Sequence, residues 1–142
     1  MSRVINPDSA GKERTRLSKA IVLSIRQIAR LQDISDESRD LSAFIVLALK
    51  QISKGIDISV AAWEKRDYWV KADRFRMEWA WAGALAEKLR TALLADDWAN
   101  VAMISAQVAE KLSKVKVSEK HRMGSPWVGA YRQLLDEGKI EN

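Results

Sequence analysis

The sequence predicts an all-α fold, an up-and-down four-helix bundle with a short C-terminal fifth helix. Apolar residues recur at intervals of three and four along most of the chain, which is the spacing of one helix face. Only six Gly and two Pro interrupt the 142 residues, which disfavours an all-β fold with its many turns. The connectors between the periodic segments are short, and short connectors make successive helices antiparallel neighbours.

The first helix is expected from about Ser9 to Gln32. Residues 1–8 are expected to form an N-terminal arm, because Asn6-Pro7-Asp8 is a typical turn sequence. The apolar seam of this helix has heptad spacing and consists of Leu17, Ile21, Ser24, Ile28 and Leu31.

The second helix is predicted from Asp36 to about Lys65, with Ser35 as its N-cap. Its apolar stripe passes through Gly55 without a change of phase. A glycine inside a helix costs about 1 kcal/mol relative to alanine. Seven in-phase positions should outweigh that cost, so the helix is predicted to be unbroken.

The segment Trp63–Leu94 is the one around which the chain is expected to be organised, because it holds four of the six tryptophans. A turn is needed near Arg66–Trp69, and Asp67 tolerates the left-handed conformation better than most residues. A third helix follows from about Trp69 to Leu94. Beside its main apolar stripe runs a second one, Val70, Met77, Trp81 and Ala84. Such a helix lies at the centre of a bundle or leaves one face for a partner.

Asp96 is predicted to cap a fourth helix, whose apolar stripe continues to Val115. Residues 116–124 are basic and without pattern, and are expected to form a loop. Ser125-Pro126 should start a short fifth helix that ends at Gly138. We treat residues 1–142 as a single domain, which is an ordinary size for one hydrophobic core.

Composition narrows the function classes. The absence of cysteine excludes disulfides, thiolate metal sites and a Cys nucleophile. No apolar run approaches the ~18 residues of a membrane span, and the first twenty residues lack the apolar segment of a secretory signal. We therefore expect a cytoplasmic protein that does not associate with membranes.

The net charge of +5 is concentrated in two basic segments. Residues 1–30 carry seven Lys or Arg against two acids, and residues 111–122 carry five against one. Residues 3–19 and 111–122 could thus bind phosphates of a nucleic acid, although ordinary solvated helix faces are the favoured explanation of such charge. The candidate phosphate-binding residues are Arg14, Arg16, Lys19, Lys114, Lys116, Lys120 and Arg122. No nucleic-acid-binding motif accompanies them.

The sequence gives little support for an enzymatic function. Carboxylate pairs at Glu37–Asp40 and Glu64–Asp67 have the spacing with which all-α nucleotide pyrophosphohydrolases hold Mg²⁺. An unbroken second helix would place Glu37 and Glu64 roughly 40 Å apart at about 1.5 Å per residue. His121 is the only imidazole, and no phosphate-binding glycine motif is present. We expect no catalytic residue, no metal and no cofactor.

The favoured interpretation is a non-enzymatic interaction protein that forms a homo-oligomer, or binds another protein, through its aromatic third helix. The candidate surface consists of Tyr68, Trp69, Arg74, Trp79 and Trp81, because Trp, Tyr and Arg dominate protein interfaces. The more ordinary explanation is a core helix whose charges pair with one another and with neighbouring helices, and both can hold because a helix has more than one face.

The stretches Asn6–Arg16 and Val60–Trp81 resemble a small uncharacterised family of bacterial all-helical proteins. The likeness covers most of the chain and agrees with the helical fold expected here. That family has no assigned activity, so the resemblance implies no catalytic or binding residue.

Overall fold

The protein, seen in a computed structural model, is described for residues 7–141, with side chains from Ser9 to Gly138. Its five helices are α1 (Pro7–Arg30), α2 (Asp36–Lys65), α3 (Trp69–Leu94), α4 (Trp98–Lys111) and α5 (Ala130–Glu141). These described residues contain no strand, so the predicted all-α class is confirmed. Of the expected N-terminal arm, Pro7 and Asp8 already belong to α1, and residues 1–6 lie outside the described part.

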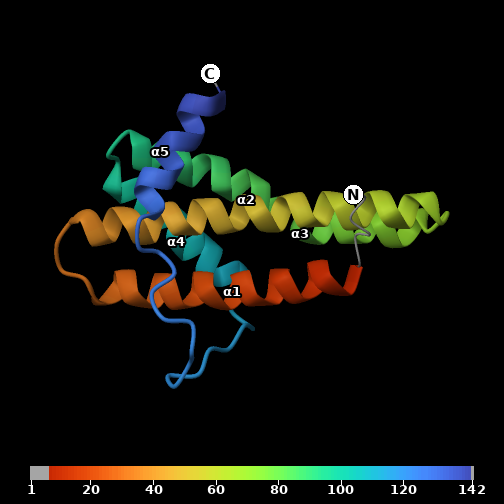
Figure 1. Ribbon diagram of the computed structural model, residues 1–142, viewed down its shortest axis with the longest axis horizontal. Helices are drawn as coiled ribbons and strands as arrows, with labels where there is room; N and C mark the ends of the chain where they lie inside the picture. Colours follow the sequence, from red (N-terminus) through yellow and green to blue (C-terminus); the bar gives the residue numbers. More distant parts are fainter. Residues whose placement is uncertain (1–6, 142) are drawn as a thin grey trace.

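The central element is α2, and not the segment Trp63–Leu94 as the sequence suggested. Helix α2 packs against α1, α3 and α5, with α1 and α5 on opposite sides of it (Figure 1). It buries twelve side chains, whereas α3 buries seven. The physical reason is composition: α2 carries Leu, Ile, Val and Ala around much of its circumference, and these residues are more often fully buried than Trp or Tyr.

Consecutive helices α1, α2 and α3 run antiparallel, as the short connectors predicted (Figure 1). The contact between α1 and α4, which would close a four-helix bundle, is much smaller than that between α2 and α3. Helix α4 also has only 14 residues, compared with 30 in α2. The structure thus contains five helices in its described residues, whereas their arrangement as an up-and-down four-helix bundle stays a prediction.

The N-terminus of α2 is fixed by a reciprocal cap. The Ser35 hydroxyl accepts a hydrogen bond from the Ser38 backbone N–H at 3.3 Å, and the Ser38 hydroxyl accepts one from the Ser35 N–H at 2.8 Å. Such a capping box satisfies two amides that the helix leaves without partners. The helix then continues through Gly55 without a break, as predicted.

Two tight turns follow α2 and α3, and in each an aspartate adopts a positive φ, Asp67 with 63° and Asp96 with 56°. The expectation for Asp67 is confirmed. The predicted cap of α4 is wrong by one residue, because Asp96 is needed in the turn. Its neighbour Asp97 caps the helix instead, and accepts a hydrogen bond from the Asn100 backbone N–H at 3.3 Å.

The predicted start and end of the fifth helix are also wrong. Residues 126–129 form turns, and α5 begins at Ala130 and continues past Gly138 to Glu141. Its cap comes from α2: the Asp40 carboxylate accepts hydrogen bonds from the backbone N–H of Gly129 at 3.1 Å and of Tyr131 at 3.0 Å. A residue about 90 positions earlier in the chain thus determines where α5 begins.

The core lies between α2 and its neighbours. Its largest fully buried apolar side chains are Ile21, Leu41, Ile45, Val46, Leu49, Ile52, Leu89, Leu93, Val108 and Leu134. They come from all five helices, with half of them on α2. None of the described helices is both long and apolar enough to cross a membrane.

Candidate functional site

The end of the α2–α3 hairpin presents aromatic side chains to solvent. The turn between the helices is closed by the Tyr68 backbone N–H, which donates to the Trp63 carbonyl at 3.0 Å. The left-handed Asp67 reverses the chain so that Tyr68 and Trp69 emerge at the start of α3. Their exposed fractions are 54% and 55%, although rings of this size are usually well covered.

These rings border an open groove of about 950 Å³, which we call the aromatic groove. One wall is ordered by aromatic contacts: the ring centres of Trp63 and Phe75 lie 4.8 Å apart with the rings tilted at 60°, and the Lys71 ammonium lies 4.6 Å from the centre of the Trp63 ring. The lining residues are Trp63, Asp67, Tyr68, Trp69, Val70, Lys71, Arg74, Phe75 and Glu78.

The structure separates the five residues of the predicted interaction surface into two groups. Tyr68, Trp69 and Arg74 are exposed and line the aromatic groove. Trp79 and Trp81 lie further along α3, half-buried against the core, with their rings stacked at 5.7 Å. Only the first three are brought together as one site.

The outward side of α3 carries an apolar stripe that includes residues absent from the predicted surface. Val70 and Met77 are 68% and 78% exposed, and Ala80 and Ala84 are exposed as well. The half-buried Trp81 lies beside them at helical spacing. The second apolar stripe in the sequence was the signal for this surface, which we call the α3 stripe.

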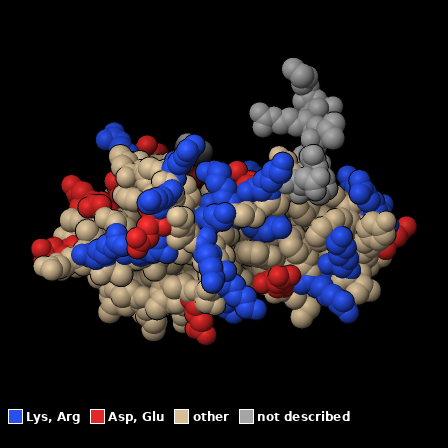
Figure 2. Space-filling view, turned by 90° about the horizontal axis from the view of Figure 1, so that it is seen from below, with Lys and Arg blue, Asp and Glu red and all other residues tan. Residues whose placement is uncertain are grey.

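The basic residues of α1 and of the connector between α4 and α5 lie on one face. Figure 2 shows Lys and Arg gathered on the face seen from below, where α1 and this connector lie in Figure 1. A contact ties the two segments, since the Arg26 guanidinium donates to the Val117 carbonyl at 3.5 Å. The candidate phosphate-binding residues that are exposed are Arg16, Lys19, Lys114, Lys116, Lys120 and Arg122.

Arg14 differs from the other candidate phosphate-binding residues because it points at aromatic rings. Its guanidinium carbon lies 4.9 Å from the centre of the Phe75 ring and 5.5 Å from that of Trp79. Burial lowers the pKa of Arg14, and the Glu78 carboxylate partly offsets this effect. Arg14 thus joins α1 to α3 through cation–π contacts.

A second groove of about 950 Å³, which we call the basic groove, lies along the first half of α1. It shares Trp63 and Lys71 with the aromatic groove, so the two grooves adjoin at these residues. Met123 of the long connector also lines it. The remaining lining residues, all from α1, are Gly11, Lys12, Arg14, Thr15, Arg16 and Lys19.

The acidic pairs considered for Mg²⁺ do not meet. Because α2 is unbroken, Glu37 and Glu64 stand at its opposite ends, roughly 40 Å apart at about 1.5 Å per residue. Glu64 pairs with Arg76 at 3.2 Å, and Asp40 caps α5. Among the described residues, no three His, Cys, Asp or Glu side chains cluster closely enough to hold a metal ion.

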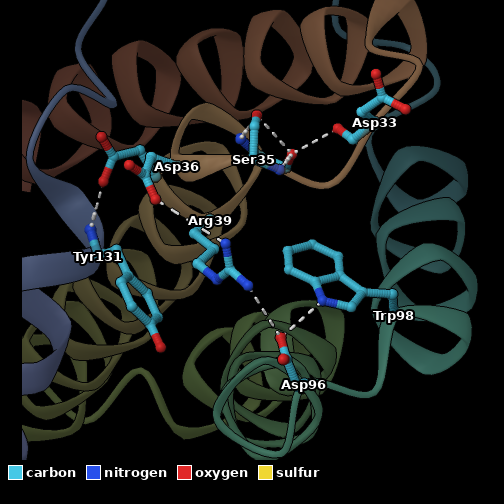
Figure 3. A network of polar contacts seen from close by, with 9 residues as sticks. Asp33, Ser35, Asp36, Arg39, Asp96, Trp98 and Tyr131 are labelled. Atoms are coloured by element: carbon cyan, nitrogen blue, oxygen red, sulfur yellow. Dashed lines mark hydrogen bonds and ion pairs between the residues drawn. The ribbon is translucent and has the colours of Figure 1, made fainter.

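At the N-terminal end of α2, polar side chains form hydrogen bonds and ion pairs with one another (Figure 3). The Asp96 carboxylate accepts a hydrogen bond from the Trp98 indole N–H at 2.8 Å and pairs with the Arg39 guanidinium at 3.5 Å. Arg39 also lies over the Trp98 ring, 5.8 Å from its centre. This arrangement holds the α3–α4 turn against α2, and we assign it a structural role.

Comparisons with protein-family models, with curated proteins and with solved structures found no match for the chain. The candidate surfaces are therefore interpreted from their geometry and chemistry.

Proposed function

We propose that this protein is a non-enzymatic interaction protein that self-associates through the α3 stripe. The observation that carries the proposal is the exposure of Val70 and Met77, at 68% and 78%, on a helix whose other side is packed in the core. Exposed apolar surface marks sites of association, and along this stripe the charged Asp73 and Arg74 lie between Val70 and Met77. A homo-oligomer would bury this stripe in every copy at once, because a two-fold interface uses the same patch on both subunits.

The shape of the stripe supports a second helix as its occupant. From Val70 to Ala84 it extends over fourteen residue steps, about 21 Å at 1.5 Å per residue. The small side chains of Ala80 and Ala84 permit close approach of another helix, at the 8–10 Å between axes that is usual for packed helices. Another copy of α3 offers the complementary set of bulky and small residues.

The neighbouring rings would contribute to the same contact. Trp81 already packs with one side against the core and leaves part of its ring at the edge of the stripe. Covering this ring and Met77 would remove apolar surface from water, at about 25 cal/mol per Å². We also propose that the protein is cytoplasmic and that residues 1–142 form a single domain.

Analytical ultracentrifugation over a wide concentration range tests this function. We expect the wild-type protein to associate, and Met77→Glu to shift it toward monomer, because a charge would then be buried in the contact. Met103→Glu is the matched control: Met103 is 53% exposed, but on α4 and away from the stripe. A wild-type protein that stays monomeric at high concentration would refute the proposal.

A further inference from the structure

We infer that the aromatic groove and the basic groove together form a binding site for single-stranded nucleic acid. This site adjoins the α3 stripe and shares Val70 with it, but it is defined by different observations: the charge of one groove, the exposed rings of the other, and the two residues, Trp63 and Lys71, at which the grooves adjoin.

The charge of the basic groove suits a chain of phosphates. Among the side chains that the structure describes, the ionic ones that line it are all cations. Glu13, also on α1, pairs with Arg16 at 2.6 Å, and this hydrogen bond raises the pKa of Arg16. The exposed cations of the long connector lie on the same face and extend the positive surface beyond the groove (Figure 2). A strand bound here would release counterions as its phosphates are neutralised.

The aromatic groove supplies surfaces for bases. Tyr68 and Trp69 each expose more than half of their area. The charged residues that line the same groove are two cations, Lys71 and Arg74, and two carboxylates, Asp67 and Glu78. The Trp63 ring between the two grooves is already oriented by Phe75 and Lys71, so it needs little ordering when a ligand arrives. Exposed rings beside a positively charged groove are the combination with which proteins bind single strands without sequence preference.

A single strand fits this surface better than a duplex or a membrane does. In a duplex the bases are already stacked on one another, so Tyr68 and Trp69 would meet phosphates, sugars and base edges but no free base face on which to stack. An anionic bilayer is flat, whereas here the cations line a groove along α1 and the rings stand at the hairpin end. A flexible strand can follow both grooves in turn.

Fluorescence anisotropy with labelled oligonucleotides measures the binding directly. The probes are a twenty-nucleotide poly(dT), a poly(rU) of equal length, a duplex of the same length, and vesicles of phosphatidylserine with phosphatidylcholine. We expect both single strands to bind more tightly than the duplex. The logarithm of the binding constant should fall linearly with the logarithm of salt concentration, with a slope of about −0.7 for each phosphate neutralised.

Two sets of variants separate stacking from charge. Trp69→Ala should weaken single-strand binding by about 5- to 100-fold, as expected for one base stacked on an aromatic ring, and should change duplex binding less than twofold. Trp69→Phe, which keeps an aromatic ring at this position, should retain most of the single-strand binding. Lys19→Gln with Lys71→Gln should weaken binding and flatten the salt dependence. Lys54→Gln with Lys88→Gln removes the same charge from residues that line neither groove, and should have little effect.

The outcomes are distinct. Absence of single-strand binding at low salt, equal loss in both double lysine variants, or indifference to Trp69→Ala would each overturn the inference. Binding to vesicles and not to oligonucleotides would overturn it in favour of a lipid surface. Met77→Glu should retain oligonucleotide binding even where it abolishes self-association, so the two proposals can fail separately.

Discussion

Helices α2 and α3 are partners of similar length in one hairpin, yet they occupy different environments. Helix α2 has neighbours on several sides, α1, α3 and α5, and its buried side chains are mainly Leu, Ile, Val and Ala. Helix α3 packs on α2 and α4, and keeps one side open along its length. The difference shows that abundance of aromatic residues does not mark the centre of this fold.

The aromatic residues around the α2–α3 turn lie where the core ends. Trp63 of α2 and Phe75 of α3 pack against each other near the turn, and Tyr68 and Trp69 are exposed at the turn itself. Stability is thus concentrated on α2 and the surfaces available for binding on α3. Three substitutions test this division, in order of decreasing expected effect.

Leu49→Ala should have the largest effect, because Leu49 is fully buried on α2. Removing a buried leucine costs about 2–5 kcal/mol, from lost apolar burial and from the cavity that remains. Leu94→Ala on α3 is the control: Leu94 is 40% exposed, and its loss should cost less than about 1 kcal/mol. Urea denaturation followed by tryptophan fluorescence measures both. Equal losses would mean that α2 is not the stabilising centre.

Asp40→Ala should have an intermediate effect. The carboxylate accepts hydrogen bonds from Gly129 and Tyr131, so its removal leaves the first turn of α5 without a cap at a cost of about 1–2 kcal/mol. Hydrogen exchange should accelerate at the amides of residues 129–133, and less so in α3. Asp57→Ala, also on α2 but exposed, should change stability by no more than about 0.5 kcal/mol. Unchanged exchange at α5 would show that Asp40 does not hold it.

Gly55→Ala should have the smallest effect and the opposite sign. A Cβ at Gly55 has no neighbour within 4 Å, so alanine should add up to about 1 kcal/mol of stability through its helix propensity. Gly83→Ala on α3 should gain less, because its Cβ would lie 2.9 Å from the Ser53 hydroxyl of α2. Thermal unfolding of the two variants measures the contrast. A loss of stability in Gly55→Ala would contradict the open environment described for that position.

Local signals in the sequence were sufficient for α2 and α3. Both begin and end where the apolar period, the Ser35 cap and the turn residue Asp67 placed them. The continuity of α2 through Gly55 was also predictable, since a stripe that keeps its phase outweighs one glycine. From this continuity the separation of Glu37 and Glu64 followed directly.

The start of α5, the cap of α4 and the exposure of the aromatic residues depended on contacts between helices, which local sequence patterns do not contain. The start of α5 is set by Asp40 on another helix, and Asp96 was unavailable as a cap because the turn required its backbone conformation. The predicted interaction residues could not be separated into exposed Tyr68 and half-buried Trp79 until the neighbours of α3 were known. The pattern revealed two apolar sides of α3, but not which one faces the core.

The cap that Asp40 provides for α5 has a consequence for biosynthesis. The ribosome delivers α2 well before residues 129–131, and domains tend to acquire structure from the N-terminus onward during translation. A helix of only twelve residues is marginally stable by itself in water. Helix α5 is therefore expected to form only once the Asp40 carboxylate is positioned to accept hydrogen bonds from its first backbone amides. Helix α5 would therefore assemble on a template completed earlier, with one carboxylate specifying its starting point.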